Sequence, residues 1–270
     1  MNQNIKQYYE DLEEFLISSL SSHICLEIDL RDNEINDEKI FLLASAIANC
    51  TQLSSLSLDL RNNKIGSYCE SDLSSTFANF SNLQILKLKM SSNQMGNQGA
   101  TILGQGLKNC LNLSTLELDV GDNQISNEGI VALGSSFKYF SNLLNLTLDL
   151  SSNKAGNEGA LSLGQALSSC IGLKSLIIDI KSNQIEETGS QGLAIALKNC
   201  TNLQILTIEL YLNKINPTGA QFLGSAFINC VNMQKLSIDL SSNLIGNKGA
   251  LWLVSNLENC TNLTKLSLNL

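Results

Sequence analysis

The sequence predicts an α/β solenoid, a stack of repeats of about 30 residues that each contribute one strand and one helix. An asparagine recurs at a constant spacing of 30 residues, an alternating apolar run precedes it, and apolar residues at helical spacing follow it. A fixed period of this size is typical of repeat architectures. We expect about nine parallel strands in one sheet. The recurring asparagines are Asn33, Asn63, Asn93, Asn123, Asn153, Asn183, Asn213 and Asn243.

The strand of each repeat lies just before the asparagine. Leu56, Leu58 and Leu60, for example, alternate with polar residues. Because successive side chains of a strand point to opposite faces, this alternation predicts one buried face. The amide of the following asparagine can satisfy backbone groups where the strand ends and the chain turns. We therefore expect the asparagine column to be buried at the strand exits.

The helix of each repeat follows the turn, as in Ala160, Leu163, Leu167 and Cys170. Asn157-Glu158-Gly159 places a capping residue and an acid at the start of that helix. The middle of the helix carries a column of mostly small residues, although each glycine costs about 1 kcal/mol of helix propensity. We expect neighbouring helices to pack closely there. The column reads Ala44, Ser74, Gly104, Gly134, Gly164, Ala194, Gly224 and Val254.

The repeats predict a single domain over residues 1–270. Residues 1–22 contain apolar residues in an amphipathic pattern and are expected to form an N-terminal capping helix or half repeat. Repeats of 30 residues fill 23–270, and the last one is incomplete. Because a solenoid normally needs a polar cap, we expect the C-terminal end to be covered by a partner or by further chain.

Composition excludes several classes of partner. The net charge of −8 and the pI near 4.7 disfavour nucleic acid and anionic membranes, which both require clustered cations. The first ten residues are mostly polar and contain no apolar core of a signal peptide, and no apolar run reaches the ~18 residues of a membrane span. The expected location is the cytoplasm, where the 8 cysteines stay reduced. A basic protein partner remains open.

The repeat resembles the leucine-rich-repeat superfamily and, within it, the ribonuclease-inhibitor-like class with a full helix per repeat. The matching residues are Leu148-Asp149-Leu150-Ser151-Ser152-Asn153, Gly156 to Ala160, and Leu163 to Leu167. One departure is a strand longer by two residues, as in Leu53 to Asn63, which leaves the faces of the strand unchanged. The Asn- and Ser-rich composition is similar to repeat proteins of AT-rich protists such as ciliates.

This resemblance implies a right-handed horseshoe with a parallel sheet on its concave side and helices on its convex side. Relatives include enzyme inhibitors, activators of a small GTPase, innate immune sensors and actin-regulating scaffolds. We therefore expect a non-catalytic scaffold that binds a protein through its concave face. Two alternatives are a regulatory subunit of an enzyme system, such as a small-GTPase activator or a kinase-targeting part, and a permanent architectural subunit of a large assembly. A GTPase assay would distinguish the first of these from the scaffold.

Residues suited to catalysis or metal binding are few, and we expect no enzyme activity, cofactor or metal. His23 is the only histidine and stands where later repeats have leucine, which predicts a packed ring. Cys25 and Cys69 are out of phase with the repeat, and Cys69 is expected to be an exposed thiol. The other cysteines share a column with Phe80 and Phe140, which predicts an apolar core position. They are Cys50, Cys110, Cys170, Cys200, Cys230 and Cys260.

The concave face carries an acidic column between the last two buried positions of each strand. If the strands align, the acids lie about 4.8 Å apart and form a docking strip for a basic segment. Lys89, between Asp59 and Asp119, and Lys87, beside Glu117, are expected to neutralise it at that end only. The alternative is that aspartate is simply common at this position of the repeat. The column reads Asp29, Asp59, Lys89, Asp119, Asp149, Asp179, Glu209, Asp239 and Asn269.

Ile177, Ile205, Tyr211 and Lys181 interrupt the polar pattern of the concave rows. Exposed apolar residues flanked by acids are typical of a binding hot spot with a charged rim. We expect these four residues, together with Asp119, Asp149, Asp179, Glu209 and Asp239, to contact the partner.

Overall fold

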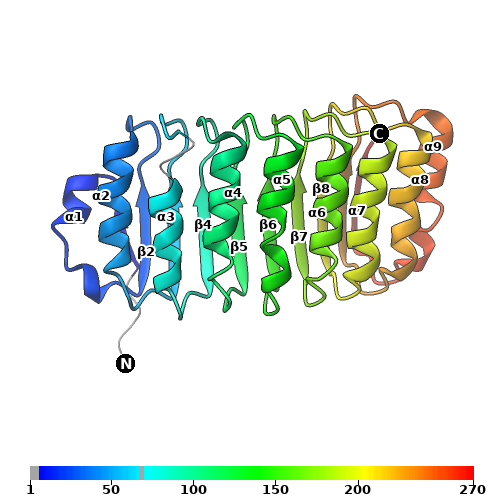
Figure 1. Ribbon diagram of the computed structural model, residues 1–270. Helices are drawn as coiled ribbons and strands as arrows, with labels where there is room; N and C mark the ends of the chain where they lie inside the picture. Colours follow the sequence, from blue (N-terminus) through cyan, green and yellow to red (C-terminus); the bar gives the residue numbers. More distant parts are fainter. Residues whose placement is uncertain (1–5, 67–69) are drawn as a thin grey trace.

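The computed structural model describes residues 6–66 and 70–270 and shows strands and helices alternating along a single stack (Figure 1). All ten strands of the described part form one sheet, in sequence order and parallel throughout. This is an α/β leucine-rich-repeat solenoid, as predicted. The strands are β1 (Gln7–Tyr9), β2 (Cys25–Asp29), β3 (Ser55–Asp59), β4 (Ile85–Lys89), β5 (Thr115–Asp119), β6 (Asn145–Asp149), β7 (Ser175–Asp179), β8 (Ile205–Glu209), β9 (Lys235–Asp239) and β10 (Lys265–Asn269).

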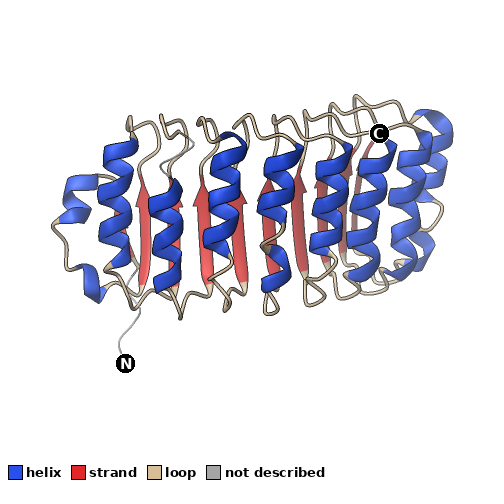
Figure 2. Ribbon diagram, viewed as in Figure 1, coloured by secondary structure: helices blue, strands red, loops and turns tan. Residues whose placement is uncertain are grey.

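The helices all cover the same face of this sheet (Figure 2). Neighbouring helix axes need 8–10 Å, whereas neighbouring strands need only about 4.8 Å, so the sheet takes the inner, concave side. The other face of the sheet carries no element of the described chain. The helices are α1 (Leu12–Leu16), α2 (Asp37–Ala48), α3 (Glu70–Thr76), α4 (Gly96–Leu107), α5 (Asn127–Gly134), α6 (Asn157–Leu167), α7 (Glu187–Asn199), α8 (Pro217–Ala226) and α9 (Gly246–Val254).

The N-terminal segment, expected to be a capping helix or half repeat, contains a short strand followed by a short helix. Gln7–Tyr9 forms β1, which pairs with β2 and adds a tenth strand, and within residues 6–22 only the five residues of α1 are α-helical. The buried ring of His23 packs against Tyr9 and Phe15, so the expectation of a packed ring is confirmed. Both ring nitrogens are hydrogen-bonded, to Ser18 and to Gln7. Burial lowers the pKa of His23.

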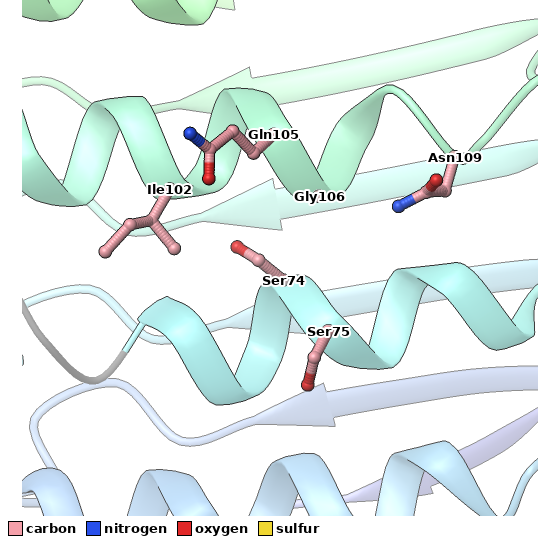
Figure 3. A pocket seen from close by; sticks show the side chains of 6 residues that line it. All are labelled: Ser74, Ser75, Ile102, Gln105, Gly106 and Asn109. Atoms are coloured by element: carbon pink, nitrogen blue, oxygen red, sulfur yellow. The ribbon is translucent and has the colours of Figure 1, made fainter.

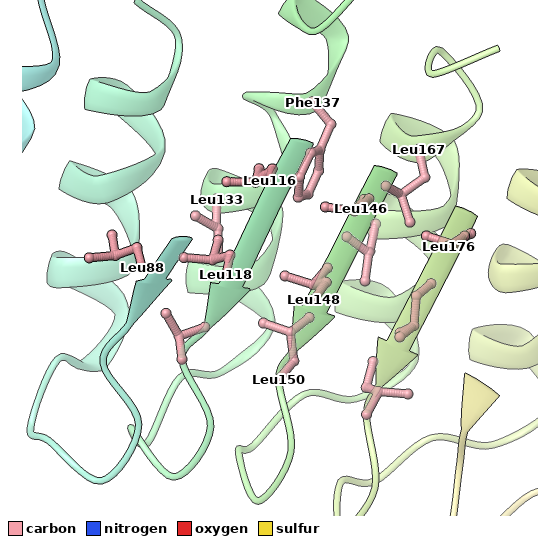
Figure 4. Packing of buried hydrophobic residues seen from close by; sticks show 14 of the residues in the cluster. Leu88, Leu116, Leu118, Leu133, Phe137, Leu146, Leu148, Leu150, Leu167 and Leu176 are labelled. Atoms are coloured by element: carbon pink, nitrogen blue, oxygen red, sulfur yellow. The ribbon is translucent and has the colours of Figure 1, made fainter. Parts of the chain in front are cut away.

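The core consists of leucine rows that run along the stack between the sheet and the helices (Figure 4). Leu116 and Leu118 of β5 align with Leu146 and Leu148 of β6, and all four are buried. Each row continues from rung to rung because the strands pair without any shift of register. At the last rung, Leu266 is 47% exposed because no described element packs beyond β10.

The asparagine column is buried at the strand exits, as predicted, except near the ends of the described stack. Asn153 is 8% exposed, and its Nδ2 donates to the carbonyls of Leu150 at 3.1 Å and of Val120 in the preceding repeat at 3.0 Å. Its Oδ1 accepts from the N–H groups of Asn123 and Ile125 at 3.1 and 2.9 Å. Each inner asparagine therefore joins two repeats through both sides of its amide.

Some helix-entry asparagines act between repeats, which corrects the expectation that Asn157 caps its own helix. Gly156 is the N-cap of α6, and Asn157 is its first helical residue. The Oδ1 of Asn157 instead accepts from the N–H groups of Glu186 and Gly189 at the start of α7, at 2.9 and 3.0 Å. Asn127 does the same for α6. These bonds tie the starts of α6 and α7 to the preceding helix, whereas Asn216 caps its own helix, α8.

The small residues in the middle of the helices allow the close packing that was predicted. A Cβ on Gly224 would lie 2.5 Å from the carbonyl oxygen of Trp252, and one on Gly164 would overlap the carbonyl of Gly192. Gly134 differs, because its nearest neighbours would lie 3.8 Å away. The requirement for glycine therefore varies along the column.

Candidate functional site

The acidic column of the concave face is aligned as predicted. Each member pairs with the next in the sheet register, from Asp29 to Asn269. All members up to Asp239 are partly buried rather than fully exposed. The strands therefore present an aligned row of carboxylates that is interrupted at Lys89.

All the aspartates of the row have a structural role that the sequence did not show. The carboxylate of Asp149 accepts from the backbone N–H of Ser151, two residues ahead, at 2.8 Å. Asp239 forms the same bond with Ser241 at 2.8 Å. Such side-chain bonds stabilise a turn, and they need an oxygen but no charge. Glu209 does not form this bond in the described structure. The other aspartates that do so are Asp29, Asp59, Asp119 and Asp179.

Cations neutralise the row at more places than expected. The Arg61 guanidinium contacts Asp59 at 2.6 Å, and Arg31 contacts Asp29 in the same way. Lys181 contacts Asp179 at 2.7 Å, which corrects the expectation of neutralisation at one end only. These three cations all lie two residues after the acid, where the turn returns their side chains to the row.

Of the two lysines of β4, Lys87 lies beside Glu117 as expected, whereas Lys89 binds differently from expectation. Lys87 and Lys89 both contact Glu117, at 3.2 and 3.1 Å. Burial alone would raise the pKa of Glu117, but the hydrogen bonds from these lysines outweigh it and lower the pKa. Lys89 forms no ion pair with its rung neighbour Asp119 in the described structure.

Two pairs of adjacent acids remain without an ion-pair partner among the described residues: Asp119 with Asp149, and Glu209 with Asp239. Burial raises the pKa of Asp119, and the neighbouring charge of Asp149 adds to this. Burial also raises the pKa of Glu209, and the charges of Asp239 and Asp179 contribute. Adjacent carboxylates about 5 Å apart repel by roughly 1 kcal/mol even in water.

The pKa of Asp239 shifts in the opposite direction. Burial acts to raise it, but hydrogen bonds from Ser241 and Asn269 outweigh burial and lower the pKa. Asp239 therefore stays ionised beside Glu209, which keeps the repulsion on Glu209.

The four residues expected to form one hot spot lie in two separate places. Ile177 and Ile205 are diagonal neighbours on β7 and β8, since Ile177 pairs with Thr207. Both are only partly exposed. Lys181 and Tyr211 lie side by side beyond the strand ends, where the N–H of the following Ser182 bonds to the Tyr211 carbonyl at 2.9 Å. Tyr211 lies six residues after Ile205, about 20 Å along an extended chain.

Sequence reasoning missed Leu212, which extends the surface around Tyr211. Leu212 is 50% exposed and Tyr211 is 39% exposed. Leu212 has φ 57°, in a column whose other members are aspartate, asparagine or serine. A left-handed conformation costs a residue with a bulky side chain about 1 kcal/mol or more. The signal was in the sequence, as a leucine in a polar turn column.

The cysteine column is buried, as predicted, with 0–5% exposure. Burial raises the pKa of Cys50 and Cys110 to about 12, so these thiols stay protonated and unreactive. The described cysteines are all free thiols, whereas Cys69 lies outside the described residues. Within residues 6–66 and 70–270 no cluster of three metal-binding side chains occurs. None of the helices in that part has the length and apolar character of a membrane span.

A hollow on the helix side offers less chemistry than the concave face. It has a volume of about 310 Å³ and lies between α3 and α4 (Figure 3). Its lining contains no charged residue. The Ser74 hydroxyl is buried there without a hydrogen-bond partner, and a Cβ on Gly106 would lie 2.6 Å from that of Ser74. The hydroxyl is therefore enclosed by close helix packing and inaccessible to a ligand.

Comparison with known proteins supports a leucine-rich-repeat protein. Residues 112–134 and 143–164 match a family model described as Leucine Rich repeat. The matched segments contain β5 with α5, and β6 with most of α6. A search of curated proteins finds no match to the chain. The leucine-rich-repeat fold is generally a non-catalytic interaction fold, and it generally binds proteins.

Proposed function

We propose that this protein is a non-catalytic scaffold that binds a partner protein through its concave face, at a basic segment of the partner. Helices of up to 13 residues in the repeats also support the ribonuclease-inhibitor-like class. The proposal places the partner over the acidic row and takes the solvent-facing side of the sheet as the binding surface.

The observation that carries this proposal is the state of Glu209. It is partly buried between Asp179 and Asp239, and its pKa is raised by burial and by both neighbours. It forms neither the turn bond of the aspartates nor an ion pair with a described residue. A charge that costs stability and has no structural role is typical of a functional position.

The surroundings of Glu209 suit a lysine or arginine of the partner. Glu209 and Asp239 together supply four carboxylate oxygens on neighbouring strands. Tyr211 follows on the same strand exit and offers an aromatic face, and Leu212 offers apolar contact. An arginine stacked on tyrosine and paired with carboxylates is a common arrangement at interface hot spots.

The test is a binding measurement with charge-neutral variants. Partners are first collected by affinity purification and mass spectrometry, and their dissociation constants are then measured at low and high salt. We expect the triple variant Asp149→Asn, Asp179→Asn and Glu209→Gln to bind at least tenfold more weakly at low salt and to show a flatter salt dependence. Asparagine keeps the oxygen that stabilises the turn, so the variant removes the charges without removing the turn bonds, although Asp179→Asn also breaks the ion pair with Lys181.

A matched control removes three charges from the helix side, with Glu38→Gln, Glu128→Gln and Glu158→Gln. We expect this variant to bind like the wild type after correction for net charge. Glu209→Gln alone should also raise the stability of the free protein slightly, because it relieves repulsion. If the triple variant binds its partner unchanged at both salt concentrations, the acidic row is only a feature of the repeat.

A further inference from the structure

A second charged feature lies on the concave face, at the opposite ends of the strands from the acidic row. A hollow of about 260 Å³ lies over the first residues of β8, β9 and β10. It is lined by concave-face side chains and by the backbone of the buried leucines between them. Those side chains are Ile205, Thr207, Lys235, Ser237, Lys265 and Ser267.

Lys235 and Lys265 give this hollow a positive charge. They are direct neighbours in the sheet register, and both are exposed. Neither forms an ion pair within the described part of the chain. An acidic group over the hollow would therefore meet two free ammonium groups. The rest of their column is uncharged, with Cys25, Ser55, Ile85, Thr115, Asn145, Ser175 and Ile205.

The same strands end in carboxylates, which gives this part of the concave face two opposite poles. Lys235 and Asp239 are the first and last residues of β9. Four residues of a parallel strand span about 13 Å. Glu209 lies beside Asp239 at the negative pole. Between the poles lie the small hydroxyl side chains of Thr207, Ser237 and Ser267, which leave room and can hydrogen-bond to a ligand's main chain.

We infer that the hollow binds a carboxylate side chain of an extended peptide segment, and that a basic residue four positions away in the same segment contacts Glu209 and Asp239. An extended peptide rises by about 3.3 Å per residue, so charges four positions apart match the spacing of the two poles. The inference rests on the proposed function and adds a second anchor, which sets the sequence and the direction of the bound segment.

The experiment selects ligands from a display library of random twelve-residue peptides on the whole protein. We expect enrichment of peptides with an acidic and a basic residue four positions apart. The double variant Lys235→Glu and Lys265→Glu should bind them at least tenfold more weakly. Changing the peptide's acid to lysine should restore at least part of that loss in the double variant. The matched control, Lys154→Glu with Lys198→Glu, changes exposed lysines outside the hollow and should bind normally.

The outcomes separate this inference from the proposed function. Peptides that lose binding with Glu209→Gln and Asp239→Asn, but bind the double lysine variant unchanged, would overturn the second anchor alone. Peptides that bind the variant with Glu209→Gln and Asp239→Asn unchanged would instead contradict the proposed function. A library that yields no concave-face binder would overturn the inference, whereas the proposed function is tested separately by the binding of the partner protein to the triple variant.

Discussion

Replacing Asn153 by alanine should test how the repeats are held together. The Asn153 side chain makes five hydrogen bonds: Oδ1 accepts two N–H groups, and Nδ2 donates to three carbonyls. Alanine leaves the buried N–H groups of Asn123 and Ile125 without this acceptor. A buried group left unpaired costs about 1–3 kcal/mol, so these two donors alone predict a loss of about 2–6 kcal/mol.

The assay is urea unfolding followed by circular dichroism, with hydrogen exchange at the Ile125 amide as a local measure. Because each repeat contacts only its neighbours, we expect exchange to rise most in the repeats joined by Asn153. The matched control is Asn33→Ala. Asn33 is exposed, and among the described residues its side chain donates only to the Arg31 carbonyl, at 2.9 Å. This control should lose less than about 1 kcal/mol.

Equal unfolding midpoints for Asn153→Ala and Asn33→Ala would refute the reasoning. The amide would then contribute no more in a buried bridge than at an exposed turn. Unchanged exchange at Ile125 would contradict the assignment of its hydrogen bond in particular.

Three further predictions follow from the packing, the thiols and the binding surface. Gly164→Ala should destabilise the protein by more than about 2 kcal/mol in urea unfolding, because the added Cβ would overlap a backbone carbonyl. Gly134→Ala should be neutral or stabilising by up to about 1 kcal/mol, and equal effects of the two changes would contradict the packing. Burial raises the pKa of Cys50 from 9.0 to about 12, so the stability that the buried thiol contributes is complete below pH 9 and is lost as the pH rises towards 12. The urea midpoint of unfolding should therefore fall across this pH range, and a flat profile would argue against burial of the thiols. Tyr211→Ala should raise the dissociation rate of the partner with little effect of salt, as measured by surface plasmon resonance, and a purely salt-dependent change would contradict an apolar contact.

The sequence determined the architecture because one short period specifies every level of it. Alternation around residues such as Leu148 assigns the buried face, and helical spacing around Leu163 assigns the convex layer. A constant repeat of 30 residues then aligns equal positions on neighbouring strands without any freedom of register. The acidic row, the buried asparagines and the buried cysteines were therefore all predictable from their positions.

The tertiary structure decided which of these residues satisfy one another. The bond from Asn157 to the next helix and the two contacts of Glu117 depend on how far a side chain reaches across neighbouring repeats. The contact of Lys181 with Asp179 depends on how the turn redirects the chain. Periodicity gives the position of each residue but not the direction of its side chain. Only the folded stack shows that Glu209 has no ion-pair partner among the described residues. It also shows that Lys235 and Lys265, at the starts of the neighbouring strands, line the hollow without an ion pair there.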